Sequence, residues 1–463
     1  MDQSPSPMPP QSSRAESTAL VLTACIIGAL MIYLVLIGNF IFGSWRGNWV
    51  YLYLPSHPYI PAWTIPVVLL SLGLFVFLGN KLIQTYERIT LLVLFLVSVF
   101  VQSLISTIYP HSFAYLVKSD RVNGFFTAAM SHSTLDLLSN YSSLLSSLPH
   151  HARSNLPGKI LLFDLFKVFT TSPEMMGYLV IVVSSLGGLL LYGICKRLFH
   201  DRKIAFYALA LYVVIPSKLF FFPVLNTVTP VFMLLSLYLF VLFLDTKRPL
   251  IPWLLGISLY ILFLYEPSPL ITGILMLGIA LHALKENKLF MKELWRLLLY
   301  AFLAFLAMDL LFYVVFHFEI VRAFLYVLND ATKFNVRQER GYLIWLVENP
   351  REFFYGTGVP VMIIFIYMTM LILTQIKRLK DLASWSLENV YVISLLVTFL
   401  VVLFLGINRG EVTRLWIYLA VLFQIPAASF IAKTGKGTIL FFVVVAVIAI
   451  QAIATLYRVS FTG

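Results

Sequence analysis

Charge is scarce in this chain, and that scarcity excludes most soluble folds. Charged residues make up 12% of the 463 residues, whereas hydrophobic residues make up 60% and the mean hydropathy is +0.90. A soluble protein of this size cannot bury so much apolar surface. The composition therefore predicts an integral membrane protein that crosses the bilayer many times.

Cysteine is also scarce. Cys25 and Cys195 are the only two, and both lie inside apolar runs, which excludes a disulfide framework and a cysteine-ligated metal site. His150 and His151 have neither a carboxylate nor a third histidine at ligand spacing, so we expect no metal. The sequence has no Gly-rich phosphate loop and no dinucleotide fingerprint. We therefore expect no cofactor and no nucleotide-consuming cytoplasmic site.

The formal charge of +12 comes without any RNA- or DNA-binding motif. Basic residues of membrane proteins gather on cytoplasmic loops, so we interpret the charge as a topology signal and expect no nucleic-acid partner.

Long apolar runs predict an all-α polytopic membrane protein with about 13 transmembrane helices. Several of the runs are shorter than the ~20 residues that a perpendicular helix needs. The runs cover residues 19–42, 63–79, 89–109, 175–195, 204–216, 228–244, 251–265, 270–284, 298–316, 359–376, 390–405, 416–432 and 438–456.

The chain divides into four predicted parts. Residues 1–18, rich in Pro, Ser and Gln, form a disordered cytoplasmic tail. Two additional spans follow in 19–88, then a transmembrane core in 89–432, and a C-terminal span in 433–463. Only two long polar segments, 109–174 and 318–356, interrupt the core.

Lys and Arg set the orientation. With a cytoplasmic N-terminus, 18 of them fall on the inner side, whereas the short outer loops and terminus hold five. Short loops dominate the positive-inside rule. We therefore predict a multi-pass protein of the plasma membrane with both long segments outside the cytoplasm.

The first long segment contains two candidate interfacial helices. Residues 158–171 include an apolar stretch of about a dozen residues, too short to span, which Asp164 and Lys167 interrupt. A second helix is predicted upstream, where apolar residues recur at helical spacing: Leu137, Tyr141, Leu144, Leu145 and Leu148.

Three short motifs carry a family resemblance. Asp120 follows the third span by about a dozen residues, the same segment ends in Asn155-Leu-Pro157-Gly158, and a later connection reads Asn408-Arg-Gly-Glu411-Val-Thr-Arg414. The three motifs, and the order in which they follow one another, resemble those of the GT-C superfamily of integral membrane glycosyltransferases. Within that superfamily the chain is similar to protein O-mannosyltransferases and aminoarabinose transferases. The family's His-Pro pair is replaced by Asn155 and Leu156, so no role of that histidine is carried over.

The resemblance, which covers residues 109–416, implies transfer of a sugar from a polyprenyl-phosphate carrier to a glycan, lipid or protein acceptor. It implies that Asp120 is the general base. The departing phosphate calls for guanidinium donors, for which we predict Arg409 and Arg414, oriented by Glu411. A single carboxylate favours inversion. Further predicted substrate contacts are Arg121, Asn155, Lys159, Glu266, Arg337 and Arg340.

Alternatives remain at each point. Asp120 can cap a helix or pair with Lys118 or Arg121, and the connection from Arg409 to Arg414 can contact lipid headgroups or hold a Glu–Arg pair that fixes the turn. Asp309, inside an apolar run, can be functional, or it can be protonated or hydrogen-bonded to a neighbouring helix. The chain can also be a transporter or flippase of lipid-linked intermediates, or an envelope-polysaccharide polymerase or ligase.

The topology can be tested by labelling. In a variant without Cys25 and Cys195, cysteine at Ser133 or Glu339 should react with a membrane-impermeant maleimide on intact cells, because both residues lie in the long segments. Cysteine at Asn287 should react only after permeabilisation. The reverse pattern would place both long segments in the cytoplasm.

Overall fold

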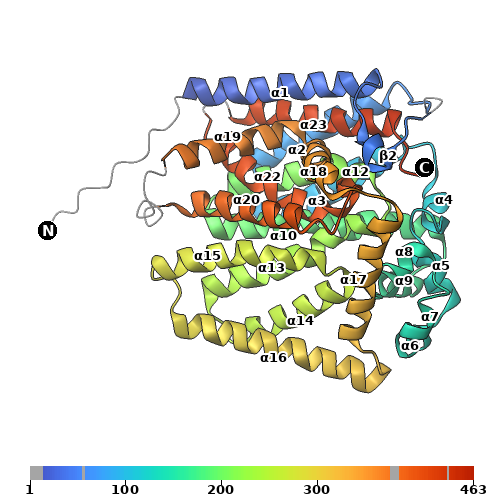
Figure 1. The fold of residues 1–463 in the computed structure, drawn as a ribbon. Coiled ribbons are helices and arrows are strands. Elements are labelled where there is room, and N and C mark those ends of the chain that lie inside the picture. Colours follow the sequence, from blue (N-terminus) through green and yellow to red (C-terminus); the bar gives the residue numbers. More distant parts are fainter. Residues whose placement is uncertain (1–13, 55–57, 376–384, 435–436, 463) are drawn as a thin grey trace.

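The computed structural model describes residues 14–54, 58–375, 385–434 and 437–462, and this part of the chain is a helical bundle (Figure 1). The strands in these ranges are β1 (Phe42–Ser44) and β2 (Trp49–Tyr51), paired antiparallel. Helices account for almost all of the described secondary structure, and many of them are apolar and long enough to cross a membrane. The predicted all-α polytopic class is confirmed. The apolar helices are α1 (Arg14–Leu36), α2 (Thr64–Leu82), α3 (Glu87–Ser106), α10 (Pro173–Phe199), α11 (Arg202–Val213), α13 (Thr229–Thr246), α14 (Leu250–Tyr265), α15 (Gly273–Lys285), α16 (Met291–Phe316), α19 (Val359–Gln375), α20 (Leu387–Leu405), α22 (Ile417–Ala432) and α23 (Gly437–Arg458).

The remaining helices are short or lie in the polar connections. The α-helices among them are α4 (Phe113–Lys118), α5 (Phe125–Ser131), α6 (Thr134–Ser139), α7 (Tyr141–Leu144), α8 (His150–Arg153), α9 (Gly158–Lys167), α12 (Pro216–Phe220), α17 (Ile320–Arg337), α18 (Tyr342–Thr357) and α21 (Val412–Leu415). Three 3-10 turns, η1 (Trp45–Gly47), η2 (Leu225–Thr227) and η3 (Ser268–Thr272), complete the described elements.

Judged by helix length and composition, the described residues contain fewer candidate spans than the predicted 13. In the described residues ten helical segments are long and apolar enough to cross a membrane, or 11 if the bent pair α18–α19 counts as one span. Two predicted spans, at α14 and α22, form shorter apolar helices. Each of the 13 predicted runs overlaps one apolar helix, but the count of 13 itself stays a prediction.

Both long polar segments lie at one end of the bundle. Figure 1 shows α4–α9 and α17 together at the end opposite the one where α1 begins. The segments contact each other: the Ser154 hydroxyl donates to Asp330 at 2.9 Å, and the rings of Tyr141 and Phe318 are 5.5 Å apart. Whatever chemistry the polar segments support is therefore concentrated at this end, called here the loop end.

The two predicted interfacial helices fold differently from each other. Helix α9 forms as one helix over Gly158–Lys167 and packs against α5 and α14. The single helix predicted around Leu137–Leu148 is wrong, because α6 and α7 are separate. The backbone leaves helical geometry at Asn140 (φ −110°, ψ 17°). Apolar periodicity continues through this break, so the sequence pattern did not mark it. Residues 1–13 of the predicted tail lie outside the described residues, and Arg14 already belongs to α1.

Close backbone packing joins α14 to α16 at Gly256. A Cβ atom at Gly256 would lie 2.1 Å from the carbonyl oxygen of Ala301 and 2.7 Å from the Cβ of Ala304. Small residues allow such an approach between membrane helices. This contact helps to fix the position of α16 against the bundle.

Gly256→Ala should therefore destabilise the protein, by roughly 1–3 kcal/mol for an overpacked contact. The control is Gly273→Ala, which adds the same methyl group at a position where a Cβ meets nothing within 4 Å. Thermal midpoints in detergent, read by size-exclusion after heating, should fall for Gly256→Ala relative to the control. Equal midpoints would show that α16 shifts at little cost.

Candidate functional site

A buried ionic network is the main polar feature of the loop end. Arg340, between α17 and α18, donates from Nη2 to Oε1 of Glu411 at 3.1 Å. Arg414 on α21 pairs with the other carboxylate oxygen, Oε2. The chain reaches this point through two residues of positive φ, Gly410 (83°) and Glu411 (59°). The turn allows one carboxylate to bind two guanidinium groups from different connections.

Arg409 belongs to the same cluster but binds backbone. Its Nη1 donates to the carbonyl of Arg340 at 2.9 Å and its Nε to the carbonyl of Gly406 at 3.1 Å. Arg340 returns a hydrogen bond from Nη1 to the carbonyl of Arg409 at 2.8 Å. Asn349 on α18 also holds this connection, accepting from the amide of Gly410 at 3.1 Å. The predicted phosphate donor Arg409 thus serves to fasten two connections together.

The network carries more positive than negative charge. Burial raises the pKa of Glu411, but the Arg414 and Arg340 guanidinium groups more than offset this, so its pKa is lowered and the group is ionised at pH 7. The Arg340 guanidinium also lies over the rings of Trp49 and Phe334, at 4.8 and 4.9 Å from their centroids. The Nε atoms of Arg340 and Arg414 are buried and have no hydrogen-bond partner among the described residues. These two N–H groups remain available to donate hydrogen bonds to a bound anion.

A second buried ion pair joins α9 to the end of α14. Lys159 Nζ lies 2.9 Å from Oε2 of Glu266, and it donates to the side-chain oxygen of Asn155 at 3.0 Å. Glu266 also accepts from the Thr229 hydroxyl at 2.6 Å. Burial lowers the pKa of Lys159, the Glu266 carboxylate opposes that effect, and Arg414 adds to it. The influence of Arg414 shows that the two ion pairs are electrostatic neighbours.

Three predicted contacts, Asn155, Lys159 and Glu266, therefore come together, and Arg340, Glu411 and Arg414 form the adjoining network. Arg337 stands outside it, exposed and paired with Asp330 at 3.2 Å.

Asp120 lies on the exposed surface of the first long segment. Its carboxylate accepts from the Thr127 hydroxyl at 2.7 Å, and among the described residues no ion pair joins it to Arg409 or Arg414. The neighbouring Arg121 is connected more closely, because its carbonyl is 2.7 Å from Nε2 of His151. The charges of Arg414 and Glu411 both act on the His151 ring. The predicted base therefore borders the network through Arg121 and His151 and is outside its direct contacts.

The sequence did not single out a further polar centre around Glu352. Glu352 on α18 is fully buried, and Oε2 accepts from the Thr413 hydroxyl at 3.4 Å. Its Oε1, the hydroxyl of Ser217 and the hydroxyl of Tyr51 are buried without a hydrogen-bond partner among the described residues. Gly356 lets these elements meet, since a Cβ there would lie 2.9 Å from Cγ2 of Thr413 and 3.3 Å from Cβ of Ser217.

Glu352 lies close enough to Tyr51 to influence the phenol, together with Glu411 and Arg414. Buried polar atoms without partners are uncommon and often mark a functional position. The one sequence signal was a carboxylate beside the aromatic stretch Phe353-Phe354-Tyr355.

The arrangement as a whole defines a multi-pass membrane protein with a buried cationic site at one end. Among the described residues the structure contains no group of three or more His, Cys, Asp or Glu side chains that could hold a metal ion. No family model and no curated protein matches the sequence.

His151 gives the site a predicted pH dependence. Burial and then the Arg414 guanidinium lower its pKa to about 4, against an ordinary value near 6.5. The folded protein therefore binds fewer protons than the unfolded chain between these values, so stability should fall as pH drops from about 6.5 to 4.

His151→Gln should reduce this acid sensitivity while keeping a donor for the Arg121 carbonyl. Thermal midpoints at pH 8, 6 and 5 measure the effect, and the difference at pH 8, where the ring is neutral in both states, isolates the substitution itself. Parallel pH profiles for the two proteins would show that His151 is not held neutral.

Proposed function

We propose that this chain is a membrane glycosyltransferase. It transfers one sugar from a polyprenyl-phosphate-linked donor to a glycan, lipid or protein acceptor on the extracytoplasmic face. The observation that supports this best is the buried network in which one carboxylate, Glu411, is shared by Arg340 and Arg414. A buried excess of guanidinium over carboxylate is suited to a phosphate group.

Arg414 is the best-placed phosphate donor. Its side chain is 14% exposed, its Nε has no hydrogen-bond partner among the described residues, and Glu411 holds one edge of the guanidinium. Arg409, by contrast, uses Nε and Nη1 on backbone carbonyls. In this proposal Arg414 stabilises the charge on the departing carrier phosphate, while Arg409 and Glu411 position it.

The acceptor hydroxyl needs a base, and Asp120 remains the proposed one. Its exposure at the edge of the network leaves it open to an acceptor arriving from outside the membrane, and the Thr127 hydroxyl fixes one of its oxygens. One base and one leaving phosphate describe a single displacement with inversion.

A transporter or flippase of lipid-linked intermediates is the second candidate function. Helix α11 ends at Val213, and the chain resumes as α12 at Pro216. Lys218, beside this break, is fully buried, lies 3.7 Å from the ring centroid of Tyr212, and has no hydrogen-bond partner among the described residues. Broken helices with buried polar groups are typical of transporters.

Transfer by the purified protein decides between the two. Wild type should move sugar from a panel of polyprenyl-phosphate hexoses and pentoses to extracted envelope acceptors. Arg414→Ala should lose about 10²–10³-fold in turnover, as for other lost charge-stabilising donors, and Asp120→Asn about 10²-fold or more. Arg414→Lys should lose less than Arg414→Ala, because the charge stays but the planar fork is gone.

Lys118→Gln is the control, since Lys118 is exposed and outside the network, and it should keep wild-type turnover. Unchanged turnover in both Arg414 variants would reject the phosphate role. If wild type transfers no sugar but moves the same lipids between leaflets of proteoliposomes, the second candidate is correct.

A further inference from the structure

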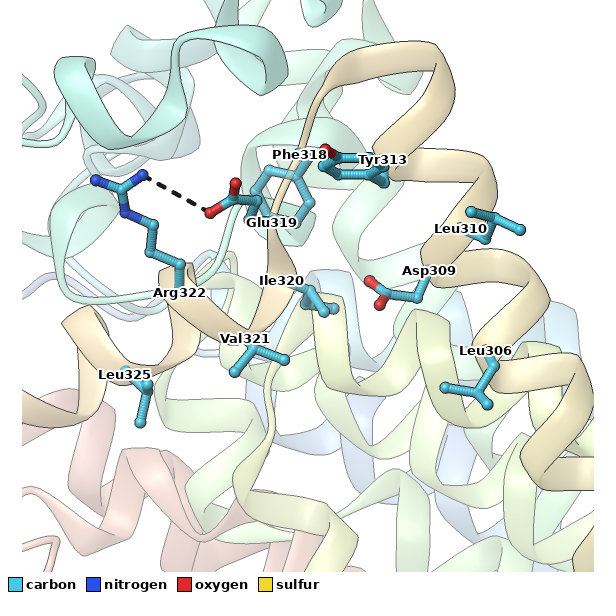
Figure 2. Close-up of a pocket in the computed structure, with 10 residues that line it drawn as sticks. All are labelled: Leu306, Asp309, Leu310, Tyr313, Phe318, Glu319, Ile320, Val321, Arg322 and Leu325. Atoms are coloured by element: carbon cyan, nitrogen blue, oxygen red, sulfur yellow. Dashed lines mark ion pairs between the residues drawn. The ribbon is translucent and has the colours of Figure 1, made fainter.

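A cavity of about 660 Å³ lies between the last turns of α16 and the start of α17 (Figure 2). Its walls are mainly apolar and largely uncovered: Leu310 on α16 is 62% exposed, and Val321 and Leu325 on α17 are 63% and 58% exposed. In a membrane these side chains face lipid. The cavity is separate from the ionic network, whose residues do not line it.

The carboxyl group of Asp309 lines this mainly apolar cavity. Figure 2 shows it on α16, directed toward the start of α17. The other charged residues of the lining, Glu319 and Arg322, pair with each other at 3.7 Å. Among the described residues no hydrogen bond or ion pair satisfies Asp309. An unpaired carboxylate in apolar surroundings is costly, and such residues in spans are usually functional.

Tyr260 on α14 packs against the same part of α16 as Asp309 but does not line the cavity. Its ring packs on Phe305 at 5.3 Å and on Phe312 at 5.2 Å. These residues flank Asp309 by one helical turn on either side, so all three share a face of α16. The Tyr260 hydroxyl is buried without a hydrogen-bond partner among the described residues, and Asp309 acts on it electrostatically.

The position of Asp309 along α16 sets the depth of the site. Asp309 precedes the last residue of the helix, Phe316, by seven residues, which corresponds to roughly 10 Å along the axis. A ligand whose polar group meets Asp309 must therefore bring that group below the end of the helix, with an apolar chain beside Leu306 and Leu310.

We propose that this cavity binds a long-chain lipid amine whose primary ammonium group pairs with the Asp309 carboxylate. Charge complementarity carries the choice: among the described residues of the lining, Asp309 has the one carboxyl group without a basic partner, and an ammonium group brings a positive charge and three donors. A hydroxyl group has one donor and no charge, so it satisfies the site less well. The proposal does not depend on glycosyl transfer.

Photolabelling tests the proposal directly. The full-length protein in phosphatidylcholine nanodiscs is titrated with hexadecylamine carrying a chain diazirine, and with the matching hexadecanol probe. Labelled peptides are mapped by mass spectrometry. The amine should label the α16–α17 peptides saturably, and Asp309→Asn should reduce this labelling on the order of tenfold, as expected for losing one charge-assisted hydrogen bond.

Asp245→Asn is the control for attraction of the amine to negative charge in general, because Asp245 is already paired with Arg197. It should leave labelling at α16–α17 unchanged. Thermal midpoints show whether each variant is folded, and Asp309→Glu, which keeps the charge, should retain most of the labelling. Equal labelling by amine and alcohol, unaffected by Asp309→Asn, would overturn the proposal and leave the cavity as ordinary lipid boundary.

Discussion

A charged group that is removed from water needs a counter-ion, and at the loop end the group with this requirement is the Glu411 carboxylate. Removing a carboxylate from solvent is unfavourable, and only close, hydrogen-bonded counter-ions compensate for it. Arg340 and Arg414 do so together. Because Arg340 and Glu411 are 71 residues apart in sequence, their ion pair joins the α17–α18 junction to the α20–α21 connection. The positions of Arg409, Asn349 and Trp49 around the network follow from that joint.

The same requirement distinguishes two kinds of polar group in this protein. Glu411 and Glu266 are buried but paired with basic groups, so they act as structural connections as well as parts of a site. Asp309 and Lys218 have no such partner among the described residues, and each lies in or beside an apolar helix. Unpaired groups of this kind are the positions at which a ligand contributes most, because binding removes an existing penalty.

Much of the fold followed from composition and periodicity. Apolar runs located the helices because a backbone in lipid must satisfy its hydrogen bonds internally. Breaks were harder to place. The runs near Leu137 and Ile204 continue in sequence, while the helices end at Ser139 and Val213. A local departure of φ and ψ, as at Asn140, leaves the pattern of apolar residues unchanged, so periodicity does not detect it.

The sequence alone determined that the chain is an all-α multi-pass membrane protein, and it identified Lys159, Glu266, Arg340, Glu411 and Arg414 as residues of interest. Only the tertiary structure decided how they pair. It assigned Arg409 to backbone carbonyls, left Arg414 with a free donor, and brought Glu352 to Thr413 across 61 residues of sequence. The physical reason is that hydropathy and spacing act along one helix or loop, whereas ion pairs form between connections whose meeting depends on how the whole bundle packs.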